Sequence, residues 1–244
     1  MKRLVMFFII CFLMVMTAGY SQQPMSPEEI MARSVARHGG DALTDWKTMV
    51  IKGEVNQPDG NIRFRGEYLL YAQKPDKLRV ERDLTKFERG RFFLSYIYNN
   101  GQGWILRNLI PSYRKEHAKL LKRWLDSCDG IAYFANSADT LTLKLEETVN
   151  GKQAYVITAV IGDDTTTLYI DKESFYLIQE EYDNVKRLYS EFKKFGNTVH
   201  ATHIDEITTG RRTMEINFIY NTIEYNVPID QELFEEDKPK SAVY

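Results

Sequence analysis

Residues 47–70 read KTMVIKGEVNQPDGNIRFRGEYLL, and this stretch decides the fold. Apolar residues or glycine stand at every second position from Met49 to Val55, and again from Ile62 to Leu70. Alternation with a period of two places successive side chains on opposite faces of a β-strand. Residues 58–61, Pro-Asp-Gly-Asn, are typical of the turn between two such strands. The segment therefore predicts a β-hairpin.

The same alternation continues along most of the chain. Further strand patterns occupy residues 78–82, 92–98, 104–106, 141–145, 155–161, 166–170, 176–182, 187–195, 198–208 and 214–220. Their connections are short, so consecutive strands should pair antiparallel. We expect a mainly β (α+β) fold, with about ten to eleven strands in one large antiparallel sheet. A sheet of this size curls because strand twist accumulates, and its concave face must be filled by something apolar.

One strand differs from the others. Apolar and aromatic residues occupy even and odd positions alike in residues 92–98. A strand with two apolar faces is typical of a sheet that is covered on both sides. We therefore expect this strand to be buried from two directions.

A first helix is expected just before the hairpin. Ser26 and Pro27, with Glu29 three residues after the serine, form the pattern of a capped helix start, and Gly39 marks the end. This helix should pack on the sheet, with a role as a functional lid as the alternative.

A second, basic amphipathic helix is expected within residues 111–136. Leu120, Leu121, Trp124 and Leu125 recur at helical spacing among lysines and arginines. We expect the helix to cover the open face of the sheet with its lysines in water. Binding to a membrane surface is the alternative interpretation.

The first 21 residues have the layout of a signal peptide. Lys2 and Arg3 precede an apolar run of residues 4–16, and small residues follow it. The run is shorter than the roughly 20 residues that a bilayer core requires, so a permanent anchor is not expected. Cys11 lies inside the apolar run rather than at the cleavage point, so we do not expect lipidation there. The sequence predicts an exported protein that is soluble after cleavage.

Residues 22–244 should then form a single domain. Once Lys2 and Arg3 are removed with the signal peptide, 30 of the 32 basic residues remain against 34 acidic ones. This balance does not suggest binding to nucleic acid. Cys128 is the one cysteine in this part of the sequence, so we expect the fold to be stabilised by its core rather than by an internal disulfide.

The sequence shows no recognisable catalytic or metal-binding motif. His200 and His203 are three apart in a predicted strand, which places them on opposite faces and makes them a poor metal pair. The acidic pairs at residues 163–164 and 180–181 are interpreted as surface residues. We expect no catalytic residue, no metal site and no cofactor.

The order of the segments resembles the periplasmic outer-membrane lipoprotein carriers of the LolA/LolB-like superfamily. Four stretches carry the resemblance: residues 66–79 (GEYLLYAQKPDKLR), residues 100–104 (NGQGW), residues 168–171 (LYID) with Leu177 and Ile178, and residues 223–234 with Asn226, Pro228, Ile229, Asp230 and Phe234. Each stretch is weak alone, but their order extends over most of residues 26–235.

The resemblance implies a half-open barrel whose helices cover an apolar concave face. It implies a periplasmic carrier that binds lipid, or the acyl chains of lipoproteins, and shuttles them toward the outer membrane. An inner-membrane donor and an outer-membrane acceptor would be its protein partners. The alternative is a non-catalytic periplasmic module that uses the same fold to bind a protein.

The residues expected to line the cavity come from both layers. The sheet would contribute the inward-facing members of Tyr68, Leu70, Phe92, Leu94, Tyr96 and Trp104, and the helical lid would contribute Leu121, Trp124 and Leu125. An ordinary core role remains the alternative for each.

Lys74 is a candidate latch for the lid. Escherichia-type carriers have an arginine directly before the turn proline, and this arginine is proposed to hold the lid by hydrogen bonds to its backbone. This chain has Lys74 before Pro75. Because lysine lacks the planar five-donor fork of arginine, a latch made by Lys74 would need different geometry.

Overall fold

The computed structural model describes residues 24–59, 62–84, 93–108, 110–113 and 115–235, so the expected signal peptide lies outside the described residues. The fold is dominated by one sheet of 14 strands. These are β1 (Thr48–Asp59), β2 (Ile62–Gln73), β3 (Lys77–Asp83), β4 (Phe93–Asn99), β5 (Gln102–Arg107), β6 (Ile110–Tyr113), β7 (Thr140–Leu143), β8 (Glu147–Val149), β9 (Lys152–Ile161), β10 (Asp164–Asp171), β11 (Leu177–Tyr182), β12 (Val185–Phe195), β13 (Thr198–Thr208) and β14 (Met214–Tyr225).

The strand order follows the chain except that β7 pairs with β9 rather than with β8, and that the first and last strands are neighbours. The sheet reads β6-β5-β4-β3-β2-β1-β14-β13-β12-β11-β10-β9-β7, with β8 also paired to β9. Every pairing is antiparallel, and the predicted hairpin of β1 and β2 is present. The pairing of β1 with β14 brings the first and last strands together in the middle of the sheet. The expected open antiparallel sheet is confirmed, and it is larger than the ten to eleven strands predicted.

Helix α2 (Pro27–His38) begins and ends close to where the sequence places it. The other helical segments of the described residues are η1 (Gly40–Leu43), α3 (Lys115–Asp126), η2 (Ser127–Asp129), α4 (Ile131–Ser137) and η3 (Gln231–Phe234). The side chain of Ser26 accepts a hydrogen bond from the Glu29 backbone N–H, which is the predicted cap. Gly39, with a φ of 132°, ends α2.

The helical segment expected at 111–136 requires a correction. Residues 110–113 form strand β6, because Ile110 pairs with Arg107 of β5 and Tyr113 pairs with Trp104. The rest divides into α3 and α4, joined by η2 and Gly130.

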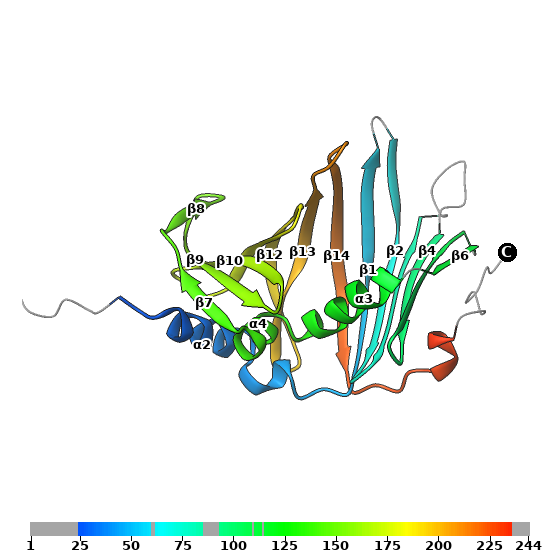
Figure 1. The fold of residues 1–244 in the computed structure, drawn as a ribbon, viewed down its shortest axis with the longest axis horizontal. Coiled ribbons are helices and arrows are strands. Elements are labelled where there is room, and N and C mark those ends of the chain that lie inside the picture. The colour runs from blue at the N-terminus through cyan, green and yellow to red at the C-terminus, as the bar shows by residue number, and fades with distance from the viewer. Residues whose placement is uncertain (1–23, 60–61, 85–92, 109, 114, 236–244) are drawn as a thin grey trace, which may run out of the picture.

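Both helical segments pack on the same face of the sheet (Figure 1). Leu121 and Leu125 of α3 share a core with β1, β2, β3 and β14. Helices α2 and α4 contact each other and form a second core, with β9 and β10. The face that was expected to need covering is thus covered by two helical groups side by side.

Strand β4 is covered from both sides, as predicted for residues 92–98, of which Phe92 lies outside the described residues. Tyr98 packs in the core beneath α3, whereas Ile97 packs with Trp104 and Leu106 on the opposite face. On that face η3 contacts β3 and β4, and Asn99 donates a hydrogen bond to the Phe234 carbonyl at 3.1 Å.

Candidate functional site

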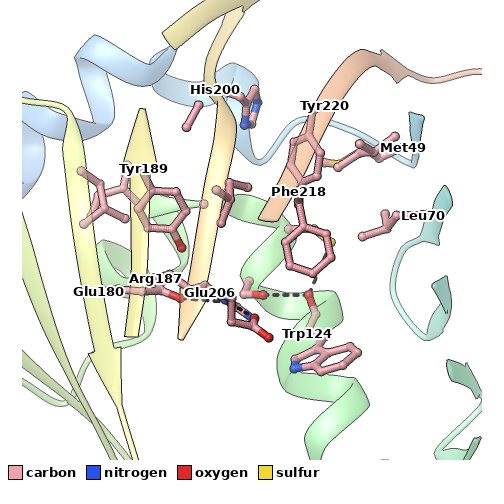
Figure 2. A pocket seen from close by; sticks show the side chains of 18 of the residues that line it. Met49, Leu70, Trp124, Glu180, Arg187, Tyr189, His200, Glu206, Phe218 and Tyr220 are labelled. Atoms are coloured by element: carbon pink, nitrogen blue, oxygen red, sulfur yellow. Dashed lines mark hydrogen bonds and ion pairs between the residues drawn. The ribbon is translucent and has the colours of Figure 1, made fainter. Parts of the chain in front are cut away.

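A cavity of about 200 Å³ lies between the sheet and the helices α3 and α4 (Figure 2). The sheet contributes residues of β1, β2 and β3 and of β11 to β14, and the helical side contributes residues of α3, η2 and α4. The cavity therefore lies at the interface between the sheet and the helices that cover it.

Aromatic and aliphatic side chains form the part of the cavity wall that β1, β2 and β14 contribute. Tyr68 and Leu70 both face the cavity because alternate residues of a strand share a face. The Tyr68 ring lies 5.1 Å from the Phe218 ring, edge to face, and 5.5 Å from the Tyr220 ring, stacked. Burial raises the pKa of Tyr68 well above its usual value, so the phenol stays neutral. This side of the cavity suits an apolar ligand.

A cluster of three charges stands at another part of the wall, where Figure 2 shows Arg187 between two glutamates. The Nη1 of Arg187 lies 3.0 Å from Glu180 Oε1, and its Nε and Nη2 each lie 2.8 Å from Glu206 Oε2. Burial opposes the charge on Arg187, but the two carboxylates outweigh burial and raise its pKa. Arg187 is thus held in its charged form beside an apolar cavity.

Two histidines, His38 and His200, also line the cavity. His38 bridges two strands, since its Nδ1 lies 2.9 Å from the Val199 carbonyl and its Nε2 accepts the Leu177 N–H at 3.2 Å. His200 Nε2 lies 2.6 Å from the Tyr225 hydroxyl. Burial lowers the pKa of both rings, that of His200 to about 4, so both are neutral at pH 7.

The helical side of the cavity is closed by Trp124 and Cys128. The Trp124 ring of α3 lies 5.0 Å from the Tyr96 ring of β4, which joins the helix to the sheet through an aromatic contact. Cys128 Sγ lies 3.4 Å from the Trp124 carbonyl, and burial raises the pKa of its thiol to about 12. The thiol is therefore protonated and unreactive at neutral pH.

Several solved structures have a similar architecture. A LolA superfamily protein from Nitrosomonas europaea superposes with a TM-score of 0.58 at 10% identity, over 88% of this chain and 99% of that chain. A domain described as that of an outer membrane lipoprotein-sorting protein from Vibrio parahaemolyticus gives 0.51 at 9% identity, over 85% of this chain and 95% of that chain. The chain has a LolA-like fold.

A third similar structure is a DUF1329 family protein from Desulfovibrio piger, with a TM-score of 0.53 at 12% identity over 86% of this chain and 98% of that chain. No family model and no curated protein sequence matches the chain. At these identities the likeness concerns the fold alone. The expected resemblance to LolA-like proteins is therefore confirmed at the level of fold.

In this LolA-like fold, Lys74 contacts the junction between the two lid helices. Its Nζ lies 2.7 Å from Asp129 Oδ1 and donates a hydrogen bond to the Thr44 carbonyl at 2.9 Å. The same carboxylate oxygen accepts the indole N–H of Trp46 at 2.8 Å. Asp129 belongs to η2, so Lys74 reaches the segment between α3 and α4 through a carboxylate rather than through backbone groups. Burial raises the pKa of Asp129 although Lys74 and Trp46 act against that rise.

The structure distributes the residues expected to line the cavity over several places. Tyr68, Leu70 and Trp124 line it. Leu121 and Leu125 are buried in the core beneath α3. Leu94 and Tyr96 share the helix-covered face of β4, as their register with Arg82 and Val80 of β3 shows.

Trp104 and Phe92 stand apart from this group. Trp104 packs with Ile97 and Leu106 on the opposite face of the sheet, because Gly103, not Trp104, is the residue of β5 that faces α3. Phe92 lies outside the described residues. Trp104 therefore does not line the cavity.

The sequence interpretation missed the charged cluster. Glu180 was expected at the surface, but it is only 6% exposed. Its burial is possible because Arg187 of the next strand pairs with it across the sheet. The sequence did contain one signal for this position. Arg187 and Tyr189 are two residues apart in a strand, so Arg187 lies on the same face as Tyr189, which packs against the core. Among the described residues, no group of three His, Cys, Asp or Glu could hold a metal ion. Within the same residues, no helix has the length and apolar character needed to cross a membrane.

Proposed function

We propose that the chain is a periplasmic carrier that binds lipid, or the acyl chains of lipoproteins, between its curved sheet and its helical lid and shuttles them toward the outer membrane. The observation that carries this proposal is the cavity, whose aromatic and aliphatic wall lies directly beneath α3 and α4. The LolA-like fold supports it, and one similar structure is described as a lipoprotein-sorting domain. No step of this function requires a catalytic group.

Loading requires the lid to move. The cavity of about 200 Å³ is smaller than the roughly 300–1,000 Å³ of typical small-molecule sites. An acyl chain of a dozen carbons gains on the order of 10 kcal/mol from burial, before ordering costs. Withdrawing Leu121, Trp124 and Leu125 from the sheet costs about 5–9 kcal/mol on the same scale. The two quantities are comparable, so an acyl chain can replace the lid residues and later be released.

The ion pair of Lys74 and Asp129 is the proposed latch of this lid. It joins the turn between β2 and β3 to the junction of α3 and α4. The side chains of Lys74 and Asp129 are 30% and 19% exposed, so water reaches the pair and can replace it when the lid opens. A latch of this kind holds the closed state without making opening costly.

The expected export and domain organisation belong to the same proposal. Residues 1–21 would be removed as a signal peptide and residues 22–244 would act as a single soluble domain in the periplasm. A donor at the inner membrane and an acceptor at the outer membrane would complete the route. Cell fractionation with N-terminal sequencing of the mature protein tests this part, and an uncleaved cytoplasmic protein would contradict it.

Mass spectrometry of the natively purified protein tests lipid binding. A carrier is expected to retain lipid or acylated peptide, or to take up a fluorescent fatty acid when it is purified empty. Trp124→Asp should weaken that uptake while the sheet remains folded. Leu120→Asp on the same helix is the matched control, because Leu120 is an exposed residue of α3. An empty protein that takes up no fatty acid would refute the proposal.

A protein-interaction module is the second candidate. The small volume of the cavity favours it, because most of the space between sheet and lid is occupied by side chains of the chain itself. In that case the fatty acid would not bind, and a partner would dock without displacing α3.

A further inference from the structure

Arg82 places a buried cation in the wall of the cavity. It belongs to β3 and pairs with Tyr68 of β2, whose ring forms part of the apolar wall. The residue is 8% exposed. Its guanidinium carbon lies 4.9 Å from the centre of the Phe218 ring and 5.5 Å from that of Tyr96. The charge is thus set between aromatic faces at the edge of an apolar space.

This guanidinium has a donor without an acceptor. The Nε–H of Arg82 is buried without a hydrogen-bond partner, and within the part of the chain that the structure describes Arg82 forms no ion pair. The aromatic faces attract the cation, but they do not accept the in-plane N–H groups. A buried charge without a counter-charge is costly, so this arrangement calls for a group that the described residues do not supply.

Arg187 lines the same cavity, and its guanidinium donors have acceptors. Its Nε and both of its terminal nitrogens are taken by the carboxylates of Glu180 and Glu206. Those two carboxylates are therefore already bound by Arg187. Among the described residues, Arg82 is left as a cation that lines the cavity without a carboxylate partner.

We propose that Arg82 binds the anionic oxygen group of an amphiphile, a carboxylate or a phosphate, whose apolar tail lies in the cavity. This inference rests on the proposed function, because it requires the cavity to accept an apolar chain. The planar fork of arginine matches the paired oxygens of both groups. The adjoining wall of Tyr68, Leu70 and Phe218 takes the first carbons of the tail.

Binding of matched amphiphiles tests the assignment. Dodecyl phosphate, dodecanol and inorganic phosphate are titrated into the purified protein, and Trp fluorescence or heat reports binding. We expect dodecyl phosphate to bind about tenfold or more tighter than dodecanol, the range of a hydrogen bond to a charged group. Arg82→Gln should remove this preference and leave the affinity for dodecanol within about twofold. Arg33→Gln is the matched control, because Arg33 is an exposed residue of α2 paired with Glu29.

The outcomes separate the two proposals. Equal affinity of the unsubstituted protein for dodecyl phosphate and dodecanol would overturn the role of Arg82 and leave the carrier function standing. If neither dodecyl phosphate nor dodecanol binds, both the role of Arg82 and the carrier function are overturned. Inorganic phosphate that binds as tightly as dodecyl phosphate would overturn the assignment of an amphiphile. The comparison of ligands on the unsubstituted protein decides the matter even if Arg82→Gln fails to fold, which thermal unfolding reveals.

Discussion

Replacing Asp129 by asparagine should release the lid without disturbing the rest of the cavity. The new amide keeps an oxygen that can accept the Trp46 indole N–H, which now lies 2.8 Å from Asp129 Oδ1. Lys74 keeps its hydrogen bond to the Thr44 carbonyl and its place 4.3 Å from the centre of the Trp46 ring. The substitution Asp129→Asn therefore removes the charge attraction across 2.7 Å between Lys74 and the lid, and little else.

The size of the effect follows from the exposure of the pair. An exposed ion pair contributes up to about 1 kcal/mol, and a charged hydrogen bond in a more buried setting about 1.5–3 kcal/mol. With side chains 30% and 19% exposed, the Lys74–Asp129 pair falls between these cases, so we expect about 1–2 kcal/mol. The open population should rise by a factor of about 5–30. Stopped-flow uptake of a fluorescent fatty acid should accelerate by the same factor if opening precedes binding.

Asp126→Asn is the matched control for the latch. Asp126 pairs with Lys122 within α3, and this pair does not join the lid to the sheet. Uptake by Asp126→Asn should match that of the unsubstituted protein. If Asp129→Asn takes up the fatty acid no faster than Asp126→Asn, the latch assignment is wrong.

Three further predictions concern the stability and chemistry of the cavity. Arg187→Met leaves Glu180 without its cation, so the free energy of unfolding measured in urea should fall by about 3 kcal/mol. Lys186→Met at the surface is the control and should cost less than about 1 kcal/mol. An equally small loss for Arg187→Met would contradict the pairing. The pKa of His200 is about 4 in the folded state against 6.5 in the unfolded chain, so the unfolded chain binds the proton more readily. The free energy of unfolding should therefore fall by up to about 3 kcal/mol as the pH drops from 6.5 to 4. His200→Gln should lose this part of the pH dependence, and an identical profile in both proteins would refute the assignment. The pKa of Cys128, about 12, predicts alkylation by iodoacetamide at pH 8 roughly a thousand times slower than that of a free thiol, and labelling at the free rate would show that the cavity opens widely.

Local patterns predicted the elements of this fold well. The alternation in residues 47–70 forms a hairpin, and Ser26 and Gly39 bound α2 as expected. These features depend on neighbours a few residues apart, so a single sequence contains the necessary information. The strand β6 was missed because Ile110–Tyr113 is too short to show a period and owes its conformation to pairing with β5.

Positions within the site were less predictable. Alternation showed that Leu70 and Tyr68 share a face, but it left open whether Trp104 faces inward, because nothing local relates the faces of β5 to those of β2. The structure places Trp104 on the opposite face. The pairing of Arg187 with Glu180 and Glu206 depends on the register of three strands. That register is set by long-range contacts.

The sequence by itself determined the class of fold, a large antiparallel sheet with two helical segments, because hydrophobic periodicity is a local property. Its segment order also sufficed to suggest the LolA-like resemblance. Only the tertiary structure decided that β1 pairs with β14, that Lys74 meets Asp129 on the lid, and that the buried Nε–H of Arg82 has no acceptor in the cavity wall. Each of these joins residues distant in the chain or depends on what surrounds a buried side chain. Such contacts exist only once the sheet has curved and the helices have packed on it, so no local pattern encodes them.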